Sequence, residues 1–317
     1  MNDMRAALYD SYGPPEVLHV GTVPVPVLQQ GQVLVRVHAV SVNGGELYGR
    51  AGRVRLVTGR KFPQRTGIDF AGEIAEVDPA VTGLRPGARV WGVLPRTFGS
   101  AAEYIAVRPR NLAYAPENIS LVEAASLPVG VTAITALRTR GRLKPGRRLL
   151  VRGASGGVGS IAVQLGKVLG AHVTALAGPK NLDFVRELGA DEAFSYTTTG
   201  PSDLGRFDVI MDTAGTELRA FRRLLAPGGR MISISFDIDH LAASLGYILA
   251  STVHGRGRVQ FFSDNPKHDR LAELAAYVES GQIRPVVDTV HPLSEIAAAH
   301  RALEAGGVRG KHVIQVV

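Results

Sequence analysis

Short apolar runs separated by turn sequences dominate residues 1–115, and this pattern is typical of β-strands. The turns include Gly13-Pro14-Pro15 and Arg85-Pro86-Gly87, and the runs between them are rich in residues that favour strands. The pattern predicts strands over residues 5–9, 32–42, 71–77, 89–93 and 101–107. This part of the chain is therefore predicted to be mainly β.

A long helical segment is predicted between Ser120 and about Arg140. Ser120 precedes an apolar helical pattern and Glu123 follows it three residues later, which is the spacing of a capping box. Pro128 lacks an N–H group, so we expect it to kink the segment.

From residue 147 onward, strand patterns alternate with helical patterns, as in a parallel sheet with helices on both faces. Strands are predicted over 147–152, 172–177, 193–196, 209–212 and 231–235, and helices over 158–169, 181–188 and 217–225. After about residue 265, helices near 269–280 and 294–305 precede a last strand, 313–317. We expect this C-terminal part to return to the first domain, which is then discontinuous.

The sequence Val-Arg-Gly-Ala-Ser-Gly-Gly-Val-Gly-Ser, residues 151–160, has four glycines directly after an apolar run. Counted from Ala154 it is A-x-G-x-x-G, the dinucleotide-binding fingerprint with Ala in place of the first glycine. Small residues allow a tight turn and let a pyrophosphate approach the backbone, while the next helix offers its N-terminal N–H groups. A purely structural turn is the alternative, but the flanking strands and helix favour cofactor binding.

The end of the next strand predicts which dinucleotide binds. An NAD site places Asp or Glu about 20 residues after the glycines, where it bonds the ribose 2′-hydroxyl. This chain has Ala177-Gly178-Pro179-Lys180 there, and no acid before Asp183. A lysine attracts the 2′-phosphate that a carboxylate would repel, so NADP(H) is favoured over NAD(H). A solvated loop lysine is the alternative for Lys180.

Composition sets limits on size and location. The 317 residues are enough for two domains, and 45% of them are apolar. The longest apolar stretch, about 241–253, contains Ser, Gly and Thr, so we expect no transmembrane helix and no membrane partner. The N-terminus lacks a signal-peptide pattern and the chain lacks Cys, so we expect a cytoplasmic protein without disulfides.

The chain carries a formal net charge of +8, and part of this excess lies in one segment. Six basic residues occur there without an acid: Arg50, Arg53, Arg55, Arg60, Lys61 and Arg65. This segment has three interpretations: a solvated loop, a collar that attracts an anionic substrate, or a nucleic-acid surface. Only Phe62 is interleaved for base stacking, so nucleic-acid binding is the least favoured.

Further segments are distinctive: VNGGELYGRAG (42–52), GIDFAGEIAEV (67–77), LRPGARVWG (84–92), GSAAEYIAV (99–107), AASLPVGVTAITAL (124–137), LGADEAFSY (188–196), MDTAG (211–215), LAPGGRMISI (225–234) and GKHVIQV (310–316). With these segments and the glycine turn, the chain resembles a zinc-independent medium-chain dehydrogenase/reductase of the quinone oxidoreductase (zeta-crystallin-like) branch. The resemblance covers nearly the whole chain. It implies an α/β fold: a doubly wound parallel Rossmann sheet, residues 125–265, and a mainly β, GroES-like catalytic domain, residues 1–124 and 266–317.

The resemblance also bears on metal binding. Zinc-dependent relatives have a Cys in the segment that matches residues 41–47, a His where this chain has Ile68, and a lobe of four cysteines that this chain lacks. The nine histidines include no i,i+4 pair on a predicted helix, so we expect no zinc site. Without a metal to polarise a carbonyl, hydride transfer to a quinone or an α,β-unsaturated carbonyl is favoured over simple alcohol oxidation.

By resemblance, Asn43, Tyr48 and Thr132 line the nicotinamide and substrate cleft. Asn43 and Tyr48 are the candidate catalytic residues, and Tyr48 is expected to hydrogen-bond the substrate oxygen or donate a proton to it. A turn asparagine and a structural tyrosine are the alternatives. The cofactor-binding set is Asn43, Thr132, Ser155, Gly156, Gly157, Val158, Gly178, Lys180, Tyr196, Ala214 and Phe261.

One segment departs from the family pattern. Relatives have Val-Asn-Pro-x-Asp where this chain has Val42-Asn43-Gly44-Gly45-Glu46. Two glycines loosen the backbone, and Glu is one methylene longer than Asp. The shape of the cleft and the substrate are therefore the least transferable parts of the resemblance.

Residues 258–263 match a strand that pairs with its copy across a two-fold axis in relatives. The alternation of Val259 and Phe261 suits an edge strand, so we expect a homodimer, with a buried intrachain strand as the alternative.

Three functions remain open at this stage. The first is an NADPH-dependent quinone or enone reductase. The second, motivated by the basic segment, is a pathway-specific enoyl reductase that acts on an acidic or carrier-bound intermediate. The third, motivated by a pI of about 10.0, is an NADPH-binding protein with little catalysis that binds RNA or acts as a sensor.

Overall fold

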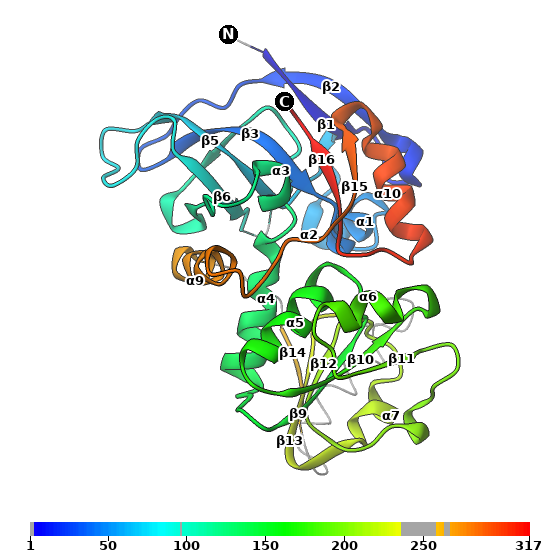
Figure 1. The fold of residues 1–317 in the computed structure, drawn as a ribbon. Helices are drawn as coiled ribbons and strands as arrows, with labels where there is room; N and C mark the ends of the chain where they lie inside the picture. Colours follow the sequence, from blue (N-terminus) through cyan, green and yellow to red (C-terminus); the bar gives the residue numbers. More distant parts are fainter. Residues whose placement is uncertain (1–2, 96, 236–257, 263–266) are drawn as a thin grey trace. The chain divides into compact units, whose positions relative to one another are not determined.

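The computed structural model describes residues 3–95, 97–235, 258–262 and 267–317. The chain divides into two compact units (Figure 1). The terminal unit comprises Met1–Val131 and Asn265–Val317, and the central unit comprises Thr132–Asp264. The predicted boundary after residue 124 falls at the end of a short helix, and the terminal unit continues from there to Val131.

The described strands of the terminal unit form two sheets. The larger has the order β15-β16-β3-β5-β6-β8, with β7 paired to β3, and the smaller has the order β2-β1-β4. The strands of the larger sheet are β3 (Val33–Ser41), β5 (Asp69–Val77), β6 (Arg89–Val93), β7 (Tyr104–Val107), β8 (Leu112–Tyr114), β15 (Val287–Pro292) and β16 (Lys311–Gln315). Those of the smaller sheet are β1 (Asp3–Tyr9), β2 (Leu18–Pro24) and β4 (Gln64–Arg65).

The sequence of β3 shows how the core of this unit forms. Val33, Val35 and Val37 are fully buried, whereas Arg36 between them is exposed. Alternate residues of a strand point to opposite faces, so the three valines lie on one face. They pack with Phe70 of β5 in the main apolar cluster of the unit.

Helices and short 3₁₀ turns join these strands. The helices are α1 (Gly44–Arg50), α2 (Arg55–Thr58), α3 (Leu121–Ala124), α9 (His268–Glu279) and α10 (Ile296–Ala305). The 3₁₀ turns are η1 (Pro15–Val17), η2 (Pro109–Asn111), η3 (Pro128–Gly130) and η7 (Leu293–Glu295). Ile296 and Ala299 of α10 are buried in the main cluster.

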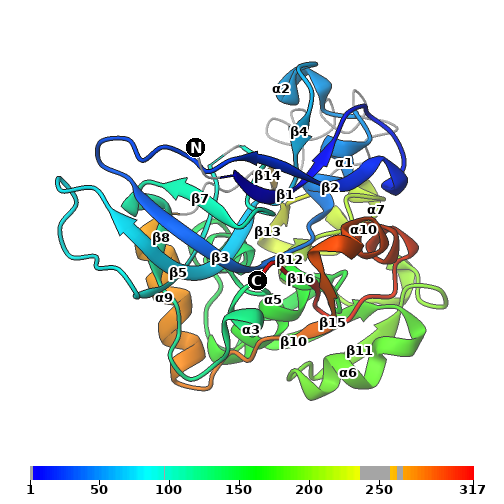
Figure 2. The same cartoon turned by 90° about the horizontal axis from the view of Figure 1, so that it is seen from above.

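The C-terminal segment returns to the terminal unit, as predicted. β16 pairs antiparallel with β3 and parallel with β15, so the end of the chain lies inside the larger sheet. Figure 2 shows β16 beside β3, and α10 next to β15. This return places Lys311, the first residue of β16, near the loop that follows β3.

The segment from Leu121 to Arg140 confirms two local predictions. The Ser120 hydroxyl accepts a hydrogen bond from the Glu123 N–H at 3.2 Å, and the Glu123 carboxylate accepts one from the Ser120 N–H at 2.8 Å, which is a capping box. The 3₁₀ turn η3 at Pro128 interrupts the helix before α4 (Val131–Ile134) and the π-helical turn η4 (Thr135–Arg140).

The same segment, Leu121–Arg140, is the one described helix that is long and apolar enough to cross a membrane. This result differs from the expectation of no such segment. However, 67% of its most apolar window is buried inside the protein, as in the core helix of a globular fold.

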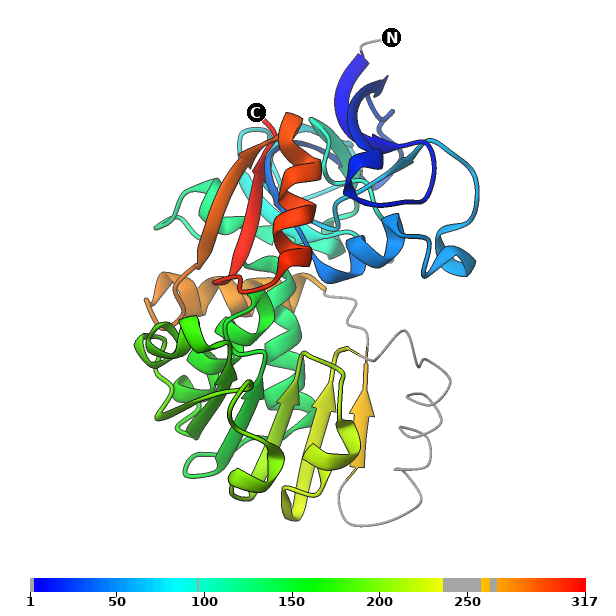
Figure 3. The same cartoon turned by 90° about the vertical axis from the view of Figure 1, so that its right-hand side faces the viewer.

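The central unit contains a parallel sheet of six described strands. Their order is β11-β10-β9-β12-β13-β14, and every neighbouring pair is parallel (Figure 3). The strands are β9 (Arg148–Arg152), β10 (His172–Ala177), β11 (Glu192–Ser195), β12 (Phe207–Asp212), β13 (Leu225–Ser233) and β14 (Arg258–Phe261). This is the strand order of a Rossmann fold.

Helices connect these strands in the direction that a doubly wound fold requires. They are α5 (Gly157–Val168), α6 (Leu182–Glu187) and α7 (Leu218–Arg222), with 3₁₀ turns η5 (Pro179–Asn181) and η6 (Pro201–Asp203). Because crossovers are right-handed, α5 and α6 lie on one face and α7 lies on the other. Leu149, Leu150 and Val151 of β9 are fully buried, as expected for a strand covered on both faces.

Several boundaries differ from the sequence prediction. The apolar pattern does not predict β2, β8 or β15; in β2 and β15 most side chains are exposed or half-buried, so no alternation marks them. The helix predicted over 217–225 ends at Arg222, because Leu225 already pairs with Phe207 at the start of β13. The apolar stretch 241–253 lies outside the described residues.

Candidate active site

The glycine turn follows β9 and opens α5, as the fingerprint predicts. Gly153 has a φ of 70°, and a Cβ atom there would lie 2.2 Å from the Oγ1 of Thr213. A Cβ atom on Gly159 would lie 2.1 Å from the carbonyl oxygen of Gly153. Neither approach is possible for a real carbon atom, so close packing requires glycine at both positions.

The N-terminus of α5 is open to a ligand. Gly156 caps this helix with its backbone alone, and no side chain caps it. The N–H groups of the first turn and the positive end of the helix dipole suit an anion such as a pyrophosphate. Ser155, Gly157 and Val158, which were predicted to bind the cofactor, are all half-buried beside this helix end. These residues therefore fit a dinucleotide.

The turn lies where the strand order reverses. The chain runs outward from β9 to β10 and β11 and then crosses to β12, so the loops after β9 and β12 leave neighbouring strands in different directions. The Thr213 hydroxyl in the second loop donates to the Arg152 carbonyl at 2.8 Å, which holds the two loops together. In open α/β sheets, ligands bind outside the carboxyl ends of the strands at this point.

A buried ion pair, Arg152–Asp212, organises the loop after β12. The guanidinium of Arg152 lies 2.7 Å from the Asp212 carboxylate and 3.6 Å from the ring centroid of Phe221. The carboxylate also accepts the N–H groups of Ala214 at 3.2 Å and Gly215 at 3.1 Å. Burial raises the pKa of Asp212, and the adjacent guanidinium opposes this shift. The Arg152–Asp212 ion pair therefore fixes the loop that contains Ala214, a predicted cofactor-binding residue. The sequence analysis did not identify this ion pair.

Three predicted residues meet at the end of β10. Gly178 opens the 3₁₀ turn η5, which contains the exposed Lys180. A Cβ atom on Gly178 would lie 3.4 Å from the Tyr196 hydroxyl, so this tyrosine lies against the turn. Asn181, which sequence reasoning missed, is buried and donates to the Ser155 hydroxyl at 3.1 Å. The 2′-phosphate site predicted from Lys180 is therefore connected directly to the glycine turn.

Phe261 and Thr132 complete the predicted set in the central unit. Phe261, the last residue of β14, pairs with Ser233 of β13. Ser233 pairs in turn with Asp212 of β12. Phe261 thus lies at the same edge of the sheet as the glycine turn. Thr132 is half-buried in α4, and its role at the nicotinamide remains a prediction.

In the terminal unit, Asn43 precedes α1 and Tyr48 lies within this helix, five residues later. Asn43 is the N-cap residue of α1, and its amide nitrogen donates to the Ser41 carbonyl, Glu46 and Asp69 at 3.0, 2.9 and 3.1 Å. Its amide oxygen accepts a hydrogen bond from Lys311. The side chain of Asn43 is therefore engaged inside the protein, which favours a positioning role.

The side chain of Tyr48 is arranged differently. It is half-buried on α1, and its hydroxyl makes no hydrogen bond to another residue in the described part of the chain. A phenol O–H that makes no hydrogen bond to these described residues can donate one to a substrate oxygen. This arrangement is compatible with the predicted role of Tyr48.

A buried charge cluster lies beneath α1. Glu46, Asp69 and Lys311 are all nearly inaccessible to solvent. Besides Asn43, Glu46 accepts from the Thr66 hydroxyl at 3.0 Å and from a backbone N–H at 3.1 Å. Asp69 accepts from the N–H and hydroxyl of Ser41 at 2.7 and 2.5 Å. The ammonium of Lys311 also donates to a backbone carbonyl at 3.2 Å.

The cluster has two carboxyl groups and one ammonium. Burial and the neighbouring Asp69 raise the pKa of Glu46 to about 7. Burial also raises the pKa of Asp69 and lowers that of Lys311. His300, whose Nε2 lies 4.0 Å from Glu46, has a pKa lowered to about 3 by burial and by Arg50, so it is neutral there. The cluster therefore holds a proton at Glu46 up to near-neutral pH.

The hydrogen bonds of Asn43 and Glu46 offset the backbone freedom of the two glycines between them, Gly44 and Gly45. Gly44 and Gly45 are exposed, and added Cβ atoms would meet nothing within 4 Å. The backbone there is fixed instead by the capping residue Asn43 and by the buried Glu46. The unusual Gly-Gly-Glu sequence thus keeps a defined helix start that carries Tyr48.

The structure corrects the interpretation of the basic segment at one residue. Arg50 is 1% exposed and forms an ion pair with Glu304 of α10, so it is neither solvated nor available to a ligand. Arg65 is half-buried, and burial lowers its pKa. The exposed positive charges of the segment are Arg53, Arg55, Arg60 and Lys61.

Comparisons with known proteins agree with this geometry. The family description "alcohol dehydrogenase GroES-like domain" matches residues 29–117, and "zinc-binding dehydrogenase" matches residues 188–314. A 2-methylene-furan-3-one reductase of Solanum lycopersicum is 33% identical, over 100% of this chain and 80% of that protein. A chloroplastic NADPH-dependent alkenal/one oxidoreductase of Arabidopsis thaliana is 33% identical, over 98% and 79%. The structure of a quinone oxidoreductase from Coxiella burnetii aligns with a TM-score of 0.90 at 29% identity, over 100% of both chains.

Identity of 33% along the whole chain decides the family. The chain belongs to the medium-chain dehydrogenase/reductase family. It is an oxidoreductase with the NAD(P)-binding fold of this family, and the resemblance inferred from its sequence is confirmed. The terminal unit contains the GroES-like domain and the central unit is the Rossmann domain.

The description that matches residues 188–314 names zinc binding, which requires a set of metal-ligating side chains. Within residues 3–95, 97–235, 258–262 and 267–317, no group of three or more His, Asp or Glu side chains is arranged to hold a metal ion. Asp69 is occupied by Ser41, Asn43 and the Lys311 charge.

Replacing Glu46 by Gln is expected to change how the stability of this protein depends on pH. The raised pKa means that the folded protein binds this proton more tightly than the unfolded chain. The stability it contributes is fully present below the ordinary Glu pKa of 4.5 and is lost as the pH rises to about 7. Relative to E46Q, the wild type should therefore lose roughly 2–3 kcal/mol of unfolding free energy over this window.

Urea unfolding between pH 4.5 and 9 measures this difference, which should become constant only above about pH 8, when Glu46 has lost its proton in the folded protein. Replacement of the exposed Glu279 by Gln is the control. A wild-type minus E46Q difference that does not vary with pH would show that Glu46 does not hold the proton.

Proposed function

We propose that this protein is an NADPH-dependent reductase of quinones and α,β-unsaturated carbonyl compounds that acts without a metal ion. The observation that carries the proposal is the edge where β9 and β12 separate. There, a bare glycine turn and an uncapped helix adjoin Lys180 and Tyr196, with no carboxylate at the end of β10. The names of two related proteins, an NADPH-dependent alkenal/one oxidoreductase and a quinone oxidoreductase, support the same chemistry.

Each part of this edge has a role in binding. The N–H groups at the start of α5 hold the pyrophosphate, Gly153 and Gly159 allow the tight turn, and Gly156 lets the pyrophosphate approach the backbone. Lys180 and the Tyr196 hydroxyl hold the 2′-phosphate. NADPH, when bound, supplies a hydride from its nicotinamide ring.

In the terminal unit, the Tyr48 hydroxyl donates a hydrogen bond to the oxygen of the substrate. This bond stabilises the negative charge that develops on that oxygen as the hydride arrives at the conjugated carbon. Asn43, Glu46, Asp69 and Lys311 fix the start of α1 and so orient Tyr48. A quinone or enone accepts hydride without a metal because conjugation already makes it electron-poor, and the chain has no Cys to form a thiolate zinc site.

A second candidate is an enoyl reductase for an acidic or carrier-bound substrate. The observation that favours it is the exposed set Arg53, Arg55, Arg60 and Lys61, which follows α1 and its Tyr48. Such a positive segment raises the local concentration of an anionic substrate.

We also propose that the protein is a homodimer in the cytoplasm. β14 is the last strand in the order of the Rossmann sheet, and by resemblance the matching strand of relatives pairs with its copy. Sedimentation equilibrium tests this part of the proposal, which requires twice the 33.7 kDa mass of the chain.

A screen of NADPH oxidation tests the proposed function. With a chelator present, quinones, enones and enoyl thioesters are supplied separately, and turnover of quinones and enones is expected. Tyr48→Phe should lower kcat by roughly 10–100-fold without weakening NADPH, because it removes only the donor to the substrate oxygen. The control is Tyr114→Phe, on an exposed residue of β8. Tight NADPH binding without turnover of any acceptor would favour the sensor or RNA-binding function.

Lys180→Ala is expected to weaken NADPH binding by about 1–3 kcal/mol and to leave NADH nearly unchanged. The reason is that the lysine forms a charge-assisted contact with the 2′-phosphate, which NADH lacks. Fluorescence titration with both cofactors measures this difference. The exposed Lys144 of the same unit, replaced by Ala, is the control. Equal losses of binding free energy for NADPH and NADH would exclude a contact between Lys180 and the 2′-phosphate.

Salt dependence separates the two candidate substrates. The kcat/KM for a carboxylated or thioester-linked enone should fall with added salt, whereas that for a neutral quinone should stay nearly constant, because salt screens the exposed charges. Joint replacement of Arg53, Arg55 and Arg60 by Gln should remove the difference. If both substrate types respond alike to salt in the wild type, the segment is a solvated loop and the enoyl reductase proposal loses its support.

A further inference from the structure

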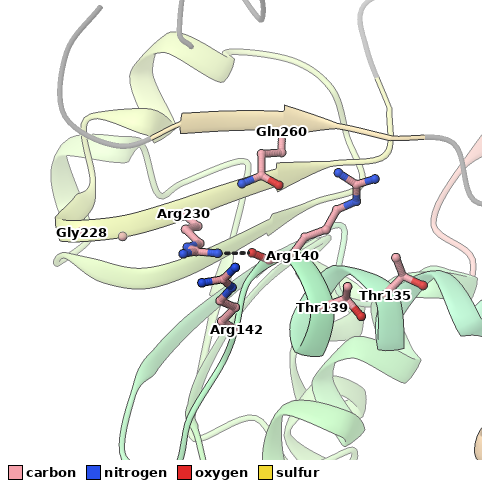
Figure 4. A pocket seen from close by; sticks show the side chains of 8 residues that line it. Thr135, Thr139, Arg140, Arg142, Gly228, Arg230 and Gln260 are labelled. Atoms are coloured by element: carbon pink, nitrogen blue, oxygen red, sulfur yellow. Dashed lines mark hydrogen bonds between the residues drawn. The ribbon is translucent and has the colours of Figure 1, made fainter. Parts of the chain in front are cut away.

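The central unit has a pocket lined by several arginines, away from the glycine turn. Its cavity volume is about 650 Å³, which is within the range of small-molecule sites. It lies between the end of η4, the start of β13 and the strand β14 (Figure 4). The lining residues are Thr135, Thr139, Arg140, Arg142, Gly228, Gly229, Arg230 and Gln260.

This pocket is distinct from the dinucleotide site. Arg230 of β13 pairs with Val209 of β12, and Val209 pairs with Leu149 near the start of β9. The glycine turn follows Arg152 at the opposite end of β9. Since all these strands are parallel, Arg230 of β13 and the glycine turn lie toward opposite edges of one sheet.

Three guanidinium groups line the pocket, and its described lining residues include no Asp or Glu. No Asp or Glu among the described residues lies within 4.0 Å of the side-chain nitrogens of Arg140, Arg142 or Arg230. In Figure 4 the side chains of Arg142 and Arg230 point toward one another, and that of Arg140 extends toward β14. The facing positive charges of Arg142 and Arg230 repel one another unless an anion lies between them, and Arg140 adds a third positive charge at the side of the pocket near β14.

Two of these arginines are held in place. Arg230 donates to the backbone carbonyl of Arg140 at 2.8 Å, which joins β13 to the end of η4. The guanidinium of Arg140 lies 4.7 Å from the ring centroid of the buried Phe262, and its Nε is buried with no hydrogen-bond partner. A fixed guanidinium loses little conformational freedom when it binds an anion, and its planar fork matches phosphate oxygens.

The backbone that carries Arg142 is unusual. It follows the π-helical turn Thr135–Arg140, and Arg142 has a φ of 51°, in the left-handed region that non-glycine residues rarely adopt. Such strain persists where the surrounding structure imposes it, and it is common at binding sites. Here it places a third positive charge at the same pocket.

We propose that this pocket binds the phosphate groups of a small di- or triphosphate-bearing ligand, at a site separate from the cofactor. Arg140, Arg142 and Arg230 supply the positive charge, and the Gln260 amide and the Thr135 hydroxyl supply further hydrogen bonds. Two or three phosphate charges match three guanidinium groups, whereas a singly charged carboxylate would leave most of the repulsion in place. This proposal does not depend on which substrate the enzyme reduces.

Calorimetric titration with inorganic pyrophosphate tests the site. The titration is made with saturating NADPH, so that the dinucleotide site is already occupied. One pyrophosphate per chain should bind. Arg142→Asn and Arg230→Gln should each raise the Kd at least tenfold, and Asn is chosen at 142 because it tolerates a positive φ. The matched control is Arg219→Gln, on an exposed arginine of α7 outside the pocket.

The titration has clear opposing outcomes. The NADPH affinity and thermal midpoint of Arg142→Asn should equal those of the wild type, so that a loss of pyrophosphate binding cannot arise from misfolding. Absence of binding to the wild type, or an equal loss in Arg219→Gln, would overturn the proposal. Binding of a single-stranded RNA 20-mer through the same arginines, without binding of pyrophosphate, would also overturn it and assign the pocket to nucleic acid.

Discussion

The chemistry of this protein depends on one constraint at the edge of the Rossmann sheet. Where the strand order reverses, the loops after β9 and β12 leave the sheet next to one another with almost no room for side chains. A single carbon atom added at Gly153 or Gly159 would overlap Thr213 or the turn backbone. The bare turn leaves the N-terminus of α5 open, and this combination of small residues and unpaired N–H groups accommodates a pyrophosphate.

Buried charges perform a similar positioning task in both units. In the central unit, the Arg152–Asp212 pair fixes the loop that contains Ala214. In the terminal unit, Glu46, Asp69 and Lys311 surround Asn43 and hold the first turn of α1, which carries Tyr48. Removing one partner of such a cluster leaves a buried charge or polar group uncompensated, so the partners constrain one another's positions.

Local features were predictable from the sequence, and distant partnerships were not. The glycine turn, the Ser120 capping box and the strand around residues 32–42 each depend on neighbouring residues, so the local sequence predicts them correctly. Arg152 and Asp212 are 60 positions apart, and Asn43 and Lys311 are 268 positions apart, so only the fold brings them together. The buried Arg50 was interpreted as part of an exposed basic segment for the same reason, because its partner Glu304 lies on α10.

Deuterium transfer tests the central claim, hydride delivery to a conjugated carbon, most directly. The enzyme is supplied with NADPH that carries deuterium on each side of nicotinamide C4 in turn, together with an enone in ordinary water. One of the two labelled cofactors should place a single deuterium on the carbon β to the carbonyl, and the other should place none, because a fixed cofactor offers one face. NADPH consumption with no deuterium at that carbon from either label would contradict the account.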